Sequence, residues 1–144
     1  MNIRGILAAK GSAVVTVRSD ATIGEAAQLL VRHGIGALVV SGDGRSVDGI
    51  LSERDLARGL ASHGAPIIDL AVGELMTSEV VVCAPTDSVD HLMGVMTERR
   101  IRHVPVVEDG ALIGLVSIGD VVKSRLDDLE TETATLHEYI TAGR

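Results

Sequence analysis

The same pattern of candidate ligand-binding residues occurs twice in this chain of 144 residues. It consists of a glycine, two apolar residues, a serine, two further residues and an aspartate, written GILSERD from Gly49 and GLVSIGD from Gly114. A serine followed three positions later by an acidic residue is a capping box, which satisfies free backbone N–H groups at the start of a helix. Each copy therefore predicts a helix start.

A helix start at the end of a strand can also bind an anion, because its free N–H groups and its dipole favour a phosphate. A carboxylate nearby can accept hydrogen bonds from both hydroxyls of a ribose. Ser52 with Asp55 and Ser117 with Asp120 are therefore candidates for a site that binds phosphate and ribose. Spacing alone favours plain capping, since capping boxes also occur where no ligand binds.

The two patterns end equivalent stretches of an internal repeat. Aligning the chain with itself pairs Val40 with Val106 and, after a one-residue adjustment, Gly49 with Gly114. Each half reads as a strand, a helix, two strands joined by a turn that contains Asp-Gly, and a second helix. The sequence thus predicts an α+β fold built from two repeats of the order strand-helix-strand-strand-helix.

The boundaries of these elements follow from apolar runs, turn residues and helix caps. Thr22 and Ser88 are the expected N-caps of the first helix in each half. The expected strands and connections are first strands at 14–17 and 80–83, third strands at 47–51 and 112–116, and a linker at 59–69. The expected domains are an N-terminal segment 1–11, a first repeat 12–65, a second repeat 66–128 and a C-terminal helix extension 129–144.

The last helix is expected to continue well beyond the second repeat. Its apolar positions alternate in steps of four and three, the spacing of a coiled-coil seam. The seam positions are Val122, Leu126, Leu129, Thr133, Leu136 and Ile140. Two interpretations stay open, a helix packed on its own domain and a helix that pairs subunits, because the stretch is short of three to four heptads.

Composition restricts the possible partners. The net charge of −7 and the near absence of aromatic residues argue against nucleic acid and anionic membranes, and no apolar run is long enough to span a bilayer. The single cysteine, Cys83, cannot form an intramolecular disulfide, so we expect a cytoplasmic protein with a buried structural thiol. The histidines show no metal-ligand spacing, and no pattern indicates catalysis.

The duplicated elements, the two repeated frames and RIRHVPVVEDG at residues 100–110 resemble a tandem pair of cystathionine-beta-synthase (CBS) domains, also called a Bateman module. The resemblance runs from about Ser12 to Leu126. It implies two repeats related by a pseudo-twofold axis, with no required cofactor. It also implies two clefts between the repeats that bind adenine nucleotides such as AMP, ADP or ATP, and in some members NAD or S-adenosyl methionine.

The resemblance also implies roles for residues of the repeated frames. Asp55 and Asp120 would bind ribose hydroxyls, and Ser52 and Ser117 would contact ribose or phosphate. We call the two sites the Asp55 cleft and the Asp120 cleft. In the family, each cleft takes its adenine wall from the opposite repeat. The walls so implied are Ser12, Val15, Gly36 and Ala37 for the Asp120 cleft, and Thr77, Val81 and Ile101 for the Asp55 cleft.

The two clefts are not expected to be equivalent. In the similar gamma subunit of AMP-activated protein kinase, basic residues before the second strand bind phosphate, and Arg102 and His103 occupy those places here. The first repeat has Gly36 and Ala37 instead, with Arg54 as a partial substitute. A charge-assisted contact contributes about 1.5 to 3 kcal/mol, so the sequence predicts tighter binding in the Asp120 cleft.

The functional expectation is a non-catalytic sensor that binds an adenine nucleotide and signals to a partner protein. The resemblance implies a homodimer, since CBS pairs commonly associate head-to-head or head-to-tail. The alternative is a constitutive interaction scaffold with vestigial clefts, because similar stand-alone pairs in plants are linked to thioredoxin-type partners. Arg99 and Arg100 are expected at a solvated helix end or in a subunit contact.

Overall fold

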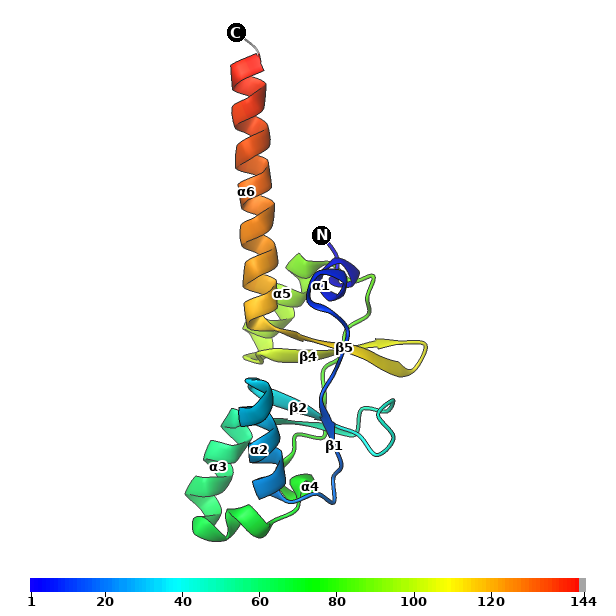
Figure 1. Ribbon diagram of the computed structural model, residues 1–144, viewed down its shortest axis with the longest axis vertical. Coiled ribbons are helices and arrows are strands. Elements are labelled where there is room, and N and C mark those ends of the chain that lie inside the picture. Colours follow the sequence, from blue (N-terminus) through cyan, green and yellow to red (C-terminus); the bar gives the residue numbers. More distant parts are fainter. Residues whose placement is uncertain (143–144) are drawn as a thin grey trace.

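The computed structural model describes residues 1–142, which form two stacked α/β layers and one long projecting helix (Figure 1). The helices are α1 (Ile3–Lys10), α2 (Ile23–His33), α3 (Glu53–His63), the 3-10 helix η1 (Ala65–Asp69), α4 (Val72–Leu75), α5 (Val89–Arg99) and α6 (Ile118–Ala142). The strands are β1 (Thr16–Val17), β2 (Ala37–Val40), β3 (Gly49–Ser52), β4 (His103–Glu108) and β5 (Ala111–Ser117). This architecture confirms the predicted α+β class.

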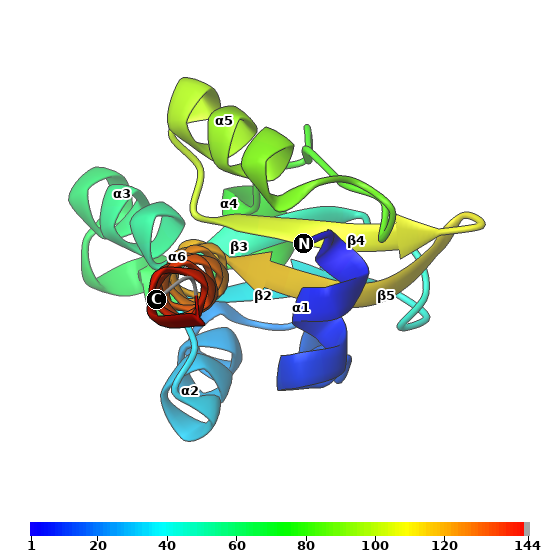
Figure 2. The same cartoon turned by 90° about the horizontal axis from the view of Figure 1, so that it is seen from above.

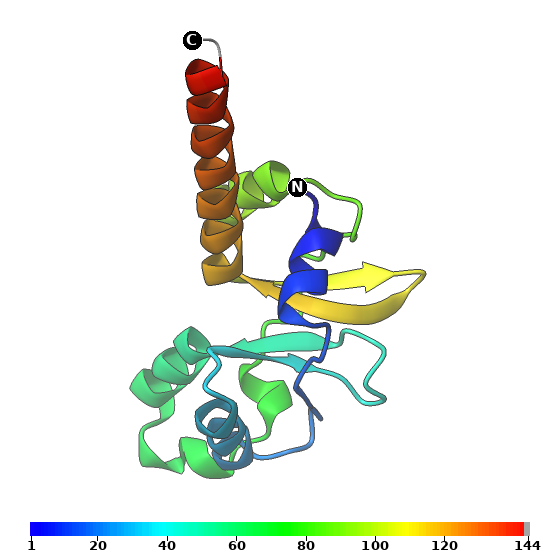
Figure 3. The ribbon, with the colours of Figure 1, turned by 45° about the horizontal axis from the view of Figure 1, so that its top comes forward.

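Each repeat contributes one small sheet, and the two sheets lie one above the other (Figure 3). In the first repeat, β1 pairs with β2 in parallel and β2 pairs with β3 antiparallel. In the second repeat, β4 pairs with β5 antiparallel. Thr22 and Ser88 cap α2 and α5 as predicted, each accepting a hydrogen bond from the backbone N–H three residues on.

The first strand predicted for the second repeat, at 80–83, is wrong, because only one bridge forms there, between Cys83 and Val106. In the first repeat two successive pairs form, Thr16 with Val39 and Val17 with Val40. Pro105 aligns with Val39, and a proline has no backbone N–H to donate to a neighbouring strand. The second repeat therefore keeps a single point of contact where the first has a short strand.

The two repeats exchange the segments that precede them. Helix α1 precedes the first repeat, but Ile3 and Leu7 are buried in the core of the second repeat with Val104 and Val116. Segment η1–α4 precedes the second repeat, but Val72 is buried in the core of the first. Figure 2 shows α1 lying across β5, although more than 100 positions separate the two elements in the chain. Each core is thus completed by the other repeat's leading segment, which fixes the two repeats together.

This exchange explains the glycine that opens each repeated frame. A Cβ atom added at Gly114 would lie 2.5 Å from Cδ2 of Leu7 in α1. A Cβ atom added at Gly49 would lie 2.6 Å from the sulfur of Met76, directly after α4. Because real Cβ atoms do not approach so closely, both glycines provide space for a side chain of the exchanged segment.

The linker predicted at 59–69 begins later than expected. Helix α3 continues through Gly59 to His63, and Gly59 is buried. A Cβ atom there would lie 2.7 Å from Cδ1 of Leu75 and 2.8 Å from Cδ1 of Ile67. Gly59 therefore allows close packing of α3 on the exchanged segment, and it is not a helix break.

Helix α6 continues to Ala142, which confirms the predicted extension of the last helix. Val121 and Ser124 are buried against the body of the protein, but every residue from Leu129 to Ala142 is exposed. The interpretation in which the whole helix packs on its own domain is therefore wrong beyond its first turns. Within residues 1–142, no helix has both the length and the apolar character needed to cross a membrane.

Candidate ligand-binding clefts

Both repeated frames form capping boxes. The Ser52 N–H donates to Oδ2 of Asp55 at 2.9 Å, and the Asp55 N–H donates to Oγ of Ser52 at 3.3 Å. The corresponding distances for Ser117 and Asp120 are 2.9 and 3.2 Å. These hydrogen bonds confirm the capping interpretation at the starts of α3 and α6. In each aspartate the serine N–H binds Oδ2, so Oδ1 can bind another partner.

A cleft of about 800 Å³ lies beside Asp55, at the junction of the two repeats. The side chain of Asp55 is almost completely buried, and its Oδ1 accepts a hydrogen bond from the Thr77 hydroxyl at 3.3 Å. The structure brings together in this cleft Ser52, Arg54, Asp55, Thr77, Val81 and Ile101, all of which the sequence placed there.

Arg102 and His103 also line the Asp55 cleft, although the sequence assigned them to the Asp120 cleft. The reason is the space left by Gly36, which lines the same cleft. A Cβ atom at Gly36 would lie 3.3 Å from Cε1 of His103 and 3.2 Å from Oε1 of Glu53. The start of β4 therefore extends over the first repeat, and the second repeat supplies its basic residues to the cleft of the first.

The Asp55 cleft gathers a cluster of cations, of which the sequence analysis named only Arg54 and Arg102 as ligand-binding residues. The arginines that line it within the described chain are Arg54 and Arg58 from α3 and Arg99, Arg100 and Arg102 from the end of α5 and the following turn. Three carboxylates, Glu53, Asp55 and Glu79, also line it. Arg99 and Arg100 are thus not merely a solvated helix end. The signal for Arg58 was its position four residues after Arg54, which places both on one helix face.

Arg100 adopts a left-handed backbone conformation, with φ 56° and ψ 43°, at the C-cap of α5. The aligned residue of the first repeat, Gly34, has almost the same angles, 61° and 39°, at the C-cap of α2. Glycine adopts this conformation freely, whereas other residues lose about 1 kcal/mol or more. The carbonyl of Arg100 accepts a hydrogen bond from Nη1 of Arg54 at 3.1 Å. The protein keeps a strained arginine where it lines the cleft, a feature common at functional sites.

His103 lies among charged groups from both repeats. Burial lowers its pKa, and the positive charges of Lys10 and Arg102 lower it further, while Glu53 and Asp120 act in the opposite direction. Since the ordinary value is 6.5, the imidazole is mainly neutral near pH 7. The positive charge of the cleft therefore comes from its arginines.

The corresponding position beside Asp120 is occupied by a side chain of the protein itself. Nζ of Lys10, the last residue of α1, donates to Oδ2 of Asp120 at 2.6 Å and to the carbonyl of Leu115 at 2.8 Å. Burial raises the pKa of Asp120, but the hydrogen bond and charge of Lys10, together with hydrogen bonds from Ser117, outweigh it and hold the pKa below its usual range. An internal cation is thus bound to the carboxylate that was expected to bind ribose hydroxyls.

The wall residues expected for the Asp120 cleft differ in their exposure and surroundings. Ala37 is fully buried in β2, and Val15 packs partly against the core of the first repeat. Ser12 is exposed, and Gly36 lines the Asp55 cleft. Helix α1 packs on β5 and brings Lys10 to Asp120 in the same region.

Cys83 is buried, as predicted for a structural thiol. Burial raises its pKa to about 12, with a further contribution from the negative charge of Asp87. A thiol with this pKa carries almost no thiolate at pH 7 and is a poor nucleophile. In the part of the chain that the structure describes, no group of three His, Cys, Asp or Glu residues is placed to hold a metal ion.

Two α/β repeats that exchange their leading segments and enclose a polar cleft at their junction define the fold of a paired-repeat module. The model of the CBS domain matches the chain twice, at residues 11–62 and 72–127. The chain therefore belongs to the CBS-domain family, and it carries a pair of these domains.

Several relatives share this domain pair. The chain is 37% identical over 129 residues to the mitochondrial CBS domain-containing protein CBSX3 of Arabidopsis thaliana, covering 87% of this chain but only 63% of that protein. It is 32% identical over 115 residues to the CBS domain-containing protein YhcV of Bacillus subtilis, covering 80% of this chain and 81% of that protein.

Solved structures agree with the fold. A CBS-domain-containing protein from Agrobacterium tumefaciens superposes with a TM-score of 0.84 at 48% identity, covering 87% of this chain and 99% of that one. A CBS domain pair in complex with 5′-methylthioadenosine and S-adenosyl-L-methionine superposes with a TM-score of 0.76 at 30% identity, covering 88% and 98%.

Proposed function

We propose that this protein is a regulatory module that binds an adenine nucleotide, such as AMP, ADP, ATP or NAD, in the Asp55 cleft. The observation that carries the proposal is the arginine cluster beside Ser52 and Asp55 in a cleft of about 800 Å³. Asp55 accepts hydrogen bonds from the ribose hydroxyls, and the arginines bind the phosphates. Arginine suits this role because its planar fork of donors matches phosphate oxygens.

The ligands of the solved relative support the adenosine part of the proposal. Methylthioadenosine and S-adenosyl-L-methionine share adenine and ribose, but neither carries a phosphate. A CBS domain pair can therefore bind an adenosine ligand that carries no phosphate. The arginines of this chain favour a ligand that adds phosphates to the same adenosine core.

The Asp55 cleft, and not the Asp120 cleft, is the tighter site in this proposal. The prediction of tighter binding at Asp120 rested on Arg102 and His103, and both line the Asp55 cleft, where they add to the arginines of the first repeat. In addition, Lys10 already donates a hydrogen bond to Oδ2 of Asp120, so a ligand hydroxyl would share this carboxylate with an internal cation.

The regulatory part of the proposal follows from the position of the cleft. Its lining comes from β3 and α3 of the first repeat and from the end of α5 and the start of β4 of the second. A ligand that binds one arrangement of the two repeats more tightly shifts the population toward it. A partner protein that contacts both repeats reads this shift, and the protein performs no chemistry on its ligand.

The test is a titration of the full chain with ATP, AMP and NAD, followed by thermal unfolding and calorimetry, with adenosine as a phosphate-free comparison. Binding to the folded state raises the melting temperature by mass action. We expect stabilisation by the nucleotides, loss of most of it in Asp55→Asn, and its retention in the matched control Asp120→Asn.

Two results would contradict this proposal. A melting temperature that no nucleotide changes would favour a constitutive scaffold with vestigial clefts, for which a thioredoxin-like protein is the first partner to test. A larger loss of binding in Asp120→Asn than in Asp55→Asn would move the nucleotide to the other cleft.

A further inference from the structure

Helix α6 carries two separate stripes of side chains. The first stripe faces the body of the protein and contains the buried residues Val121 and Ser124. The second is the apolar seam predicted from the sequence, and its apolar members are exposed. Their exposed fractions are 48% for Val122, 55% for Leu126, 44% for Leu129, 59% for Leu136 and 51% for Ile140.

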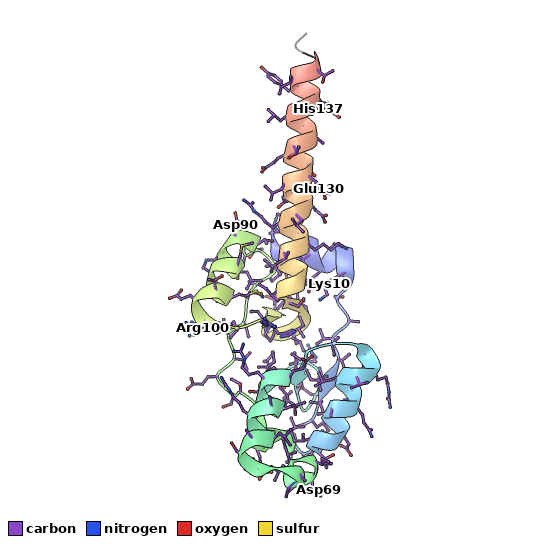
Figure 4. The ribbon with its side chains drawn as sticks, turned by 90° about the vertical axis from the view of Figure 1, so that its left-hand side faces the viewer. Lys10, Asp69, Asp90, Arg100, Glu130 and His137 are labelled. Atoms are coloured by element: carbon purple, nitrogen blue, oxygen red, sulfur yellow. The ribbon has the colours of Figure 1, made fainter. Side chains whose placement is uncertain are left out.

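The two stripes lie on different faces of the helix. With about 100° per residue, the seam is rotated by roughly 130° from the stripe that contacts the body. Another helix can therefore contact the seam while α6 keeps its own contacts to α5 and α1. Figure 4 shows the side chains around Glu130 and His137 projecting from α6 with no other element beside them.

The exposed part of α6 needs a partner to be stable. From Leu129 to Ala142 the helix has no buried residue, and its polar surface offers few stabilising contacts. Isolated helices shorter than about 12–15 residues are marginal in water, because most helical stability in proteins comes from packing of an apolar face. The seam is the face available for such packing.

The charges beside the seam identify a partner and an orientation. With Leu126 and Thr133 as a positions and Leu129 and Leu136 as d positions, Arg125 and Glu132 are g positions, and Glu130 and His137 are e positions. In a parallel pair, g residues face the following e residues of the other helix. Arg125 then faces Glu130 of a second copy, and Glu132 faces His137 of that copy.

The antiparallel arrangement has unfavourable charges. There, e positions face e positions and g positions face g positions, and the register that matches all seam layers places Glu130 opposite Glu130 and Glu132 opposite Glu132. Like charges in such places are destabilising. Arg125 is free to change partners, because its contact to Asp90 within the chain is long, at 3.7 Å, and both side chains are exposed.

The geometry points to a parallel two-stranded coiled coil formed by α6 helices of two copies of this protein. Such pairing places the globular parts of both copies at the same end of the coiled coil, because α6 projects away from the two repeats (Figure 1). This goes beyond the nucleotide site, because it specifies which ends of two modules meet. The Asp55 cleft lies at the junction of the repeats and takes no part in the seam.

Cysteine cross-linking of the full chain tests both contact and orientation. In the parallel register Thr133 meets Thr133, so Thr133→Cys should form a disulfide-linked dimer on mild oxidation. The matched control is Thr131→Cys, two residues away on the same helix but outside the seam, with an expected yield at least tenfold lower. Cys83 does not compete, because it is buried and its pKa is about 12.

A second pair of variants tests the apolar contacts. In the Thr133→Cys background, Leu129→Asp with Leu136→Asp should abolish the cross-link. In the same background, Thr131→Asp with Thr135→Asp adds the same charge outside the seam and should preserve the cross-link. Light scattering of the wild type should give twice the chain mass of 15.0 kDa. A monomeric wild type, equal yields for the two cysteines, or no cross-link in Thr133→Cys would each overturn the parallel coiled coil.

Discussion

The Asp55 and Asp120 clefts share one motif and differ in almost everything around it. Each begins with the same serine–aspartate capping box, with backbone distances that agree within 0.1 Å. Around Asp55 lies an open cleft rich in arginine, whereas Oδ2 of Asp120 is bound by Lys10. The motif therefore specifies a helix start in both repeats, and the surrounding residues decide whether a ligand can use it.

The difference arises from three aligned positions and one exchanged helix. Where the first repeat has Gly34, Gly36 and Ala37, the second has Arg100, Arg102 and His103. These basic residues contribute to the cleft of the opposite repeat. Divergence of one repeat thus equipped the ligand site of the other, which is possible only because the clefts lie at the junction.

The largest expected effect comes from removing two of the cleft arginines. In Arg58→Ala combined with Arg102→Ala, ATP affinity measured by calorimetry should fall about 100-fold or more, since each charge-assisted contact contributes about 1.5 to 3 kcal/mol. The control, Arg18→Ala with Arg32→Ala in the first repeat, removes the same charge outside the cleft. An equal loss in the control would show that net charge, and not the cleft, attracts the nucleotide.

The second prediction compares the two glycines that open the frames. Gly49→Ala should destabilise the protein by about 2–3 kcal/mol and Gly114→Ala by about 1–2 kcal/mol, both through overpacking. The first is larger because a Cβ at Gly49 also lies 3.0 Å from the backbone carbonyl of Thr77, whereas Gly114 meets only the flexible side chain of Leu7.

Urea unfolding measures these changes, with Gly94→Ala as the control. Gly94 lies within α5 with nothing inside 4 Å of an added Cβ, so alanine should stabilise it by about 0.5–1 kcal/mol. If Gly114→Ala proved the more damaging of the two frame variants, the comparison of the two exchanged segments would be wrong.

The third prediction separates stability from binding at one residue. Arg100→Gly removes a side chain from a left-handed position and should stabilise the ligand-free protein by about 0.5–1 kcal/mol. It also removes a cation from the cleft, so ATP affinity should fall about tenfold. Thermal unfolding and calorimetry should thus change in opposite directions, and unchanged affinity would exclude Arg100 from ligand binding.

The smallest expected effect concerns the internal cation. Lys10→Met should cost up to about 1 kcal/mol, because the ion pair with Asp120 is partly exposed. The pKa of Asp120 is lowered in the folded protein, so the ion pair stabilises the fold fully at pH values above the ordinary pKa of 3.8. This stabilisation is lost as the pH falls through the lowered pKa. The stability difference between wild type and variant should therefore persist at pH 5–7 and shrink below pH 3.8.

The same variant also tests the comparison of the clefts. With Lys10 replaced, Asp120 regains a free carboxylate, and calorimetry should detect a second, weaker binding event for adenosine. If Lys10→Met instead weakened the binding of ATP in a titration of the intact protein, Lys10 would be a ligand-binding residue and not an internal competitor.

Local patterns determined the elements and the residues that belong together within one repeat. The capping boxes, the helix N-caps at Thr22 and Ser88 and the long last helix depend on interactions between residues three or four apart. The family resemblance predicts the residues that lie beside Asp55, namely Thr77, Val81 and Ile101. It can do so because the first strand of a repeat and the turn before its second strand occupy the same places across the family.

Only the tertiary structure decided which cleft the cations serve and what occupies the other. The ion pair of Lys10 and Asp120 joins residues 110 positions apart, and it depends on the exchange of α1 onto the second repeat. Likewise, Arg102 reaches the Asp55 cleft because Gly36 leaves space across the junction. Sequence periodicity determines which face of a helix or strand is apolar. The contacts between the two repeats depend on how those faces pack together, and that packing is a property of the whole fold.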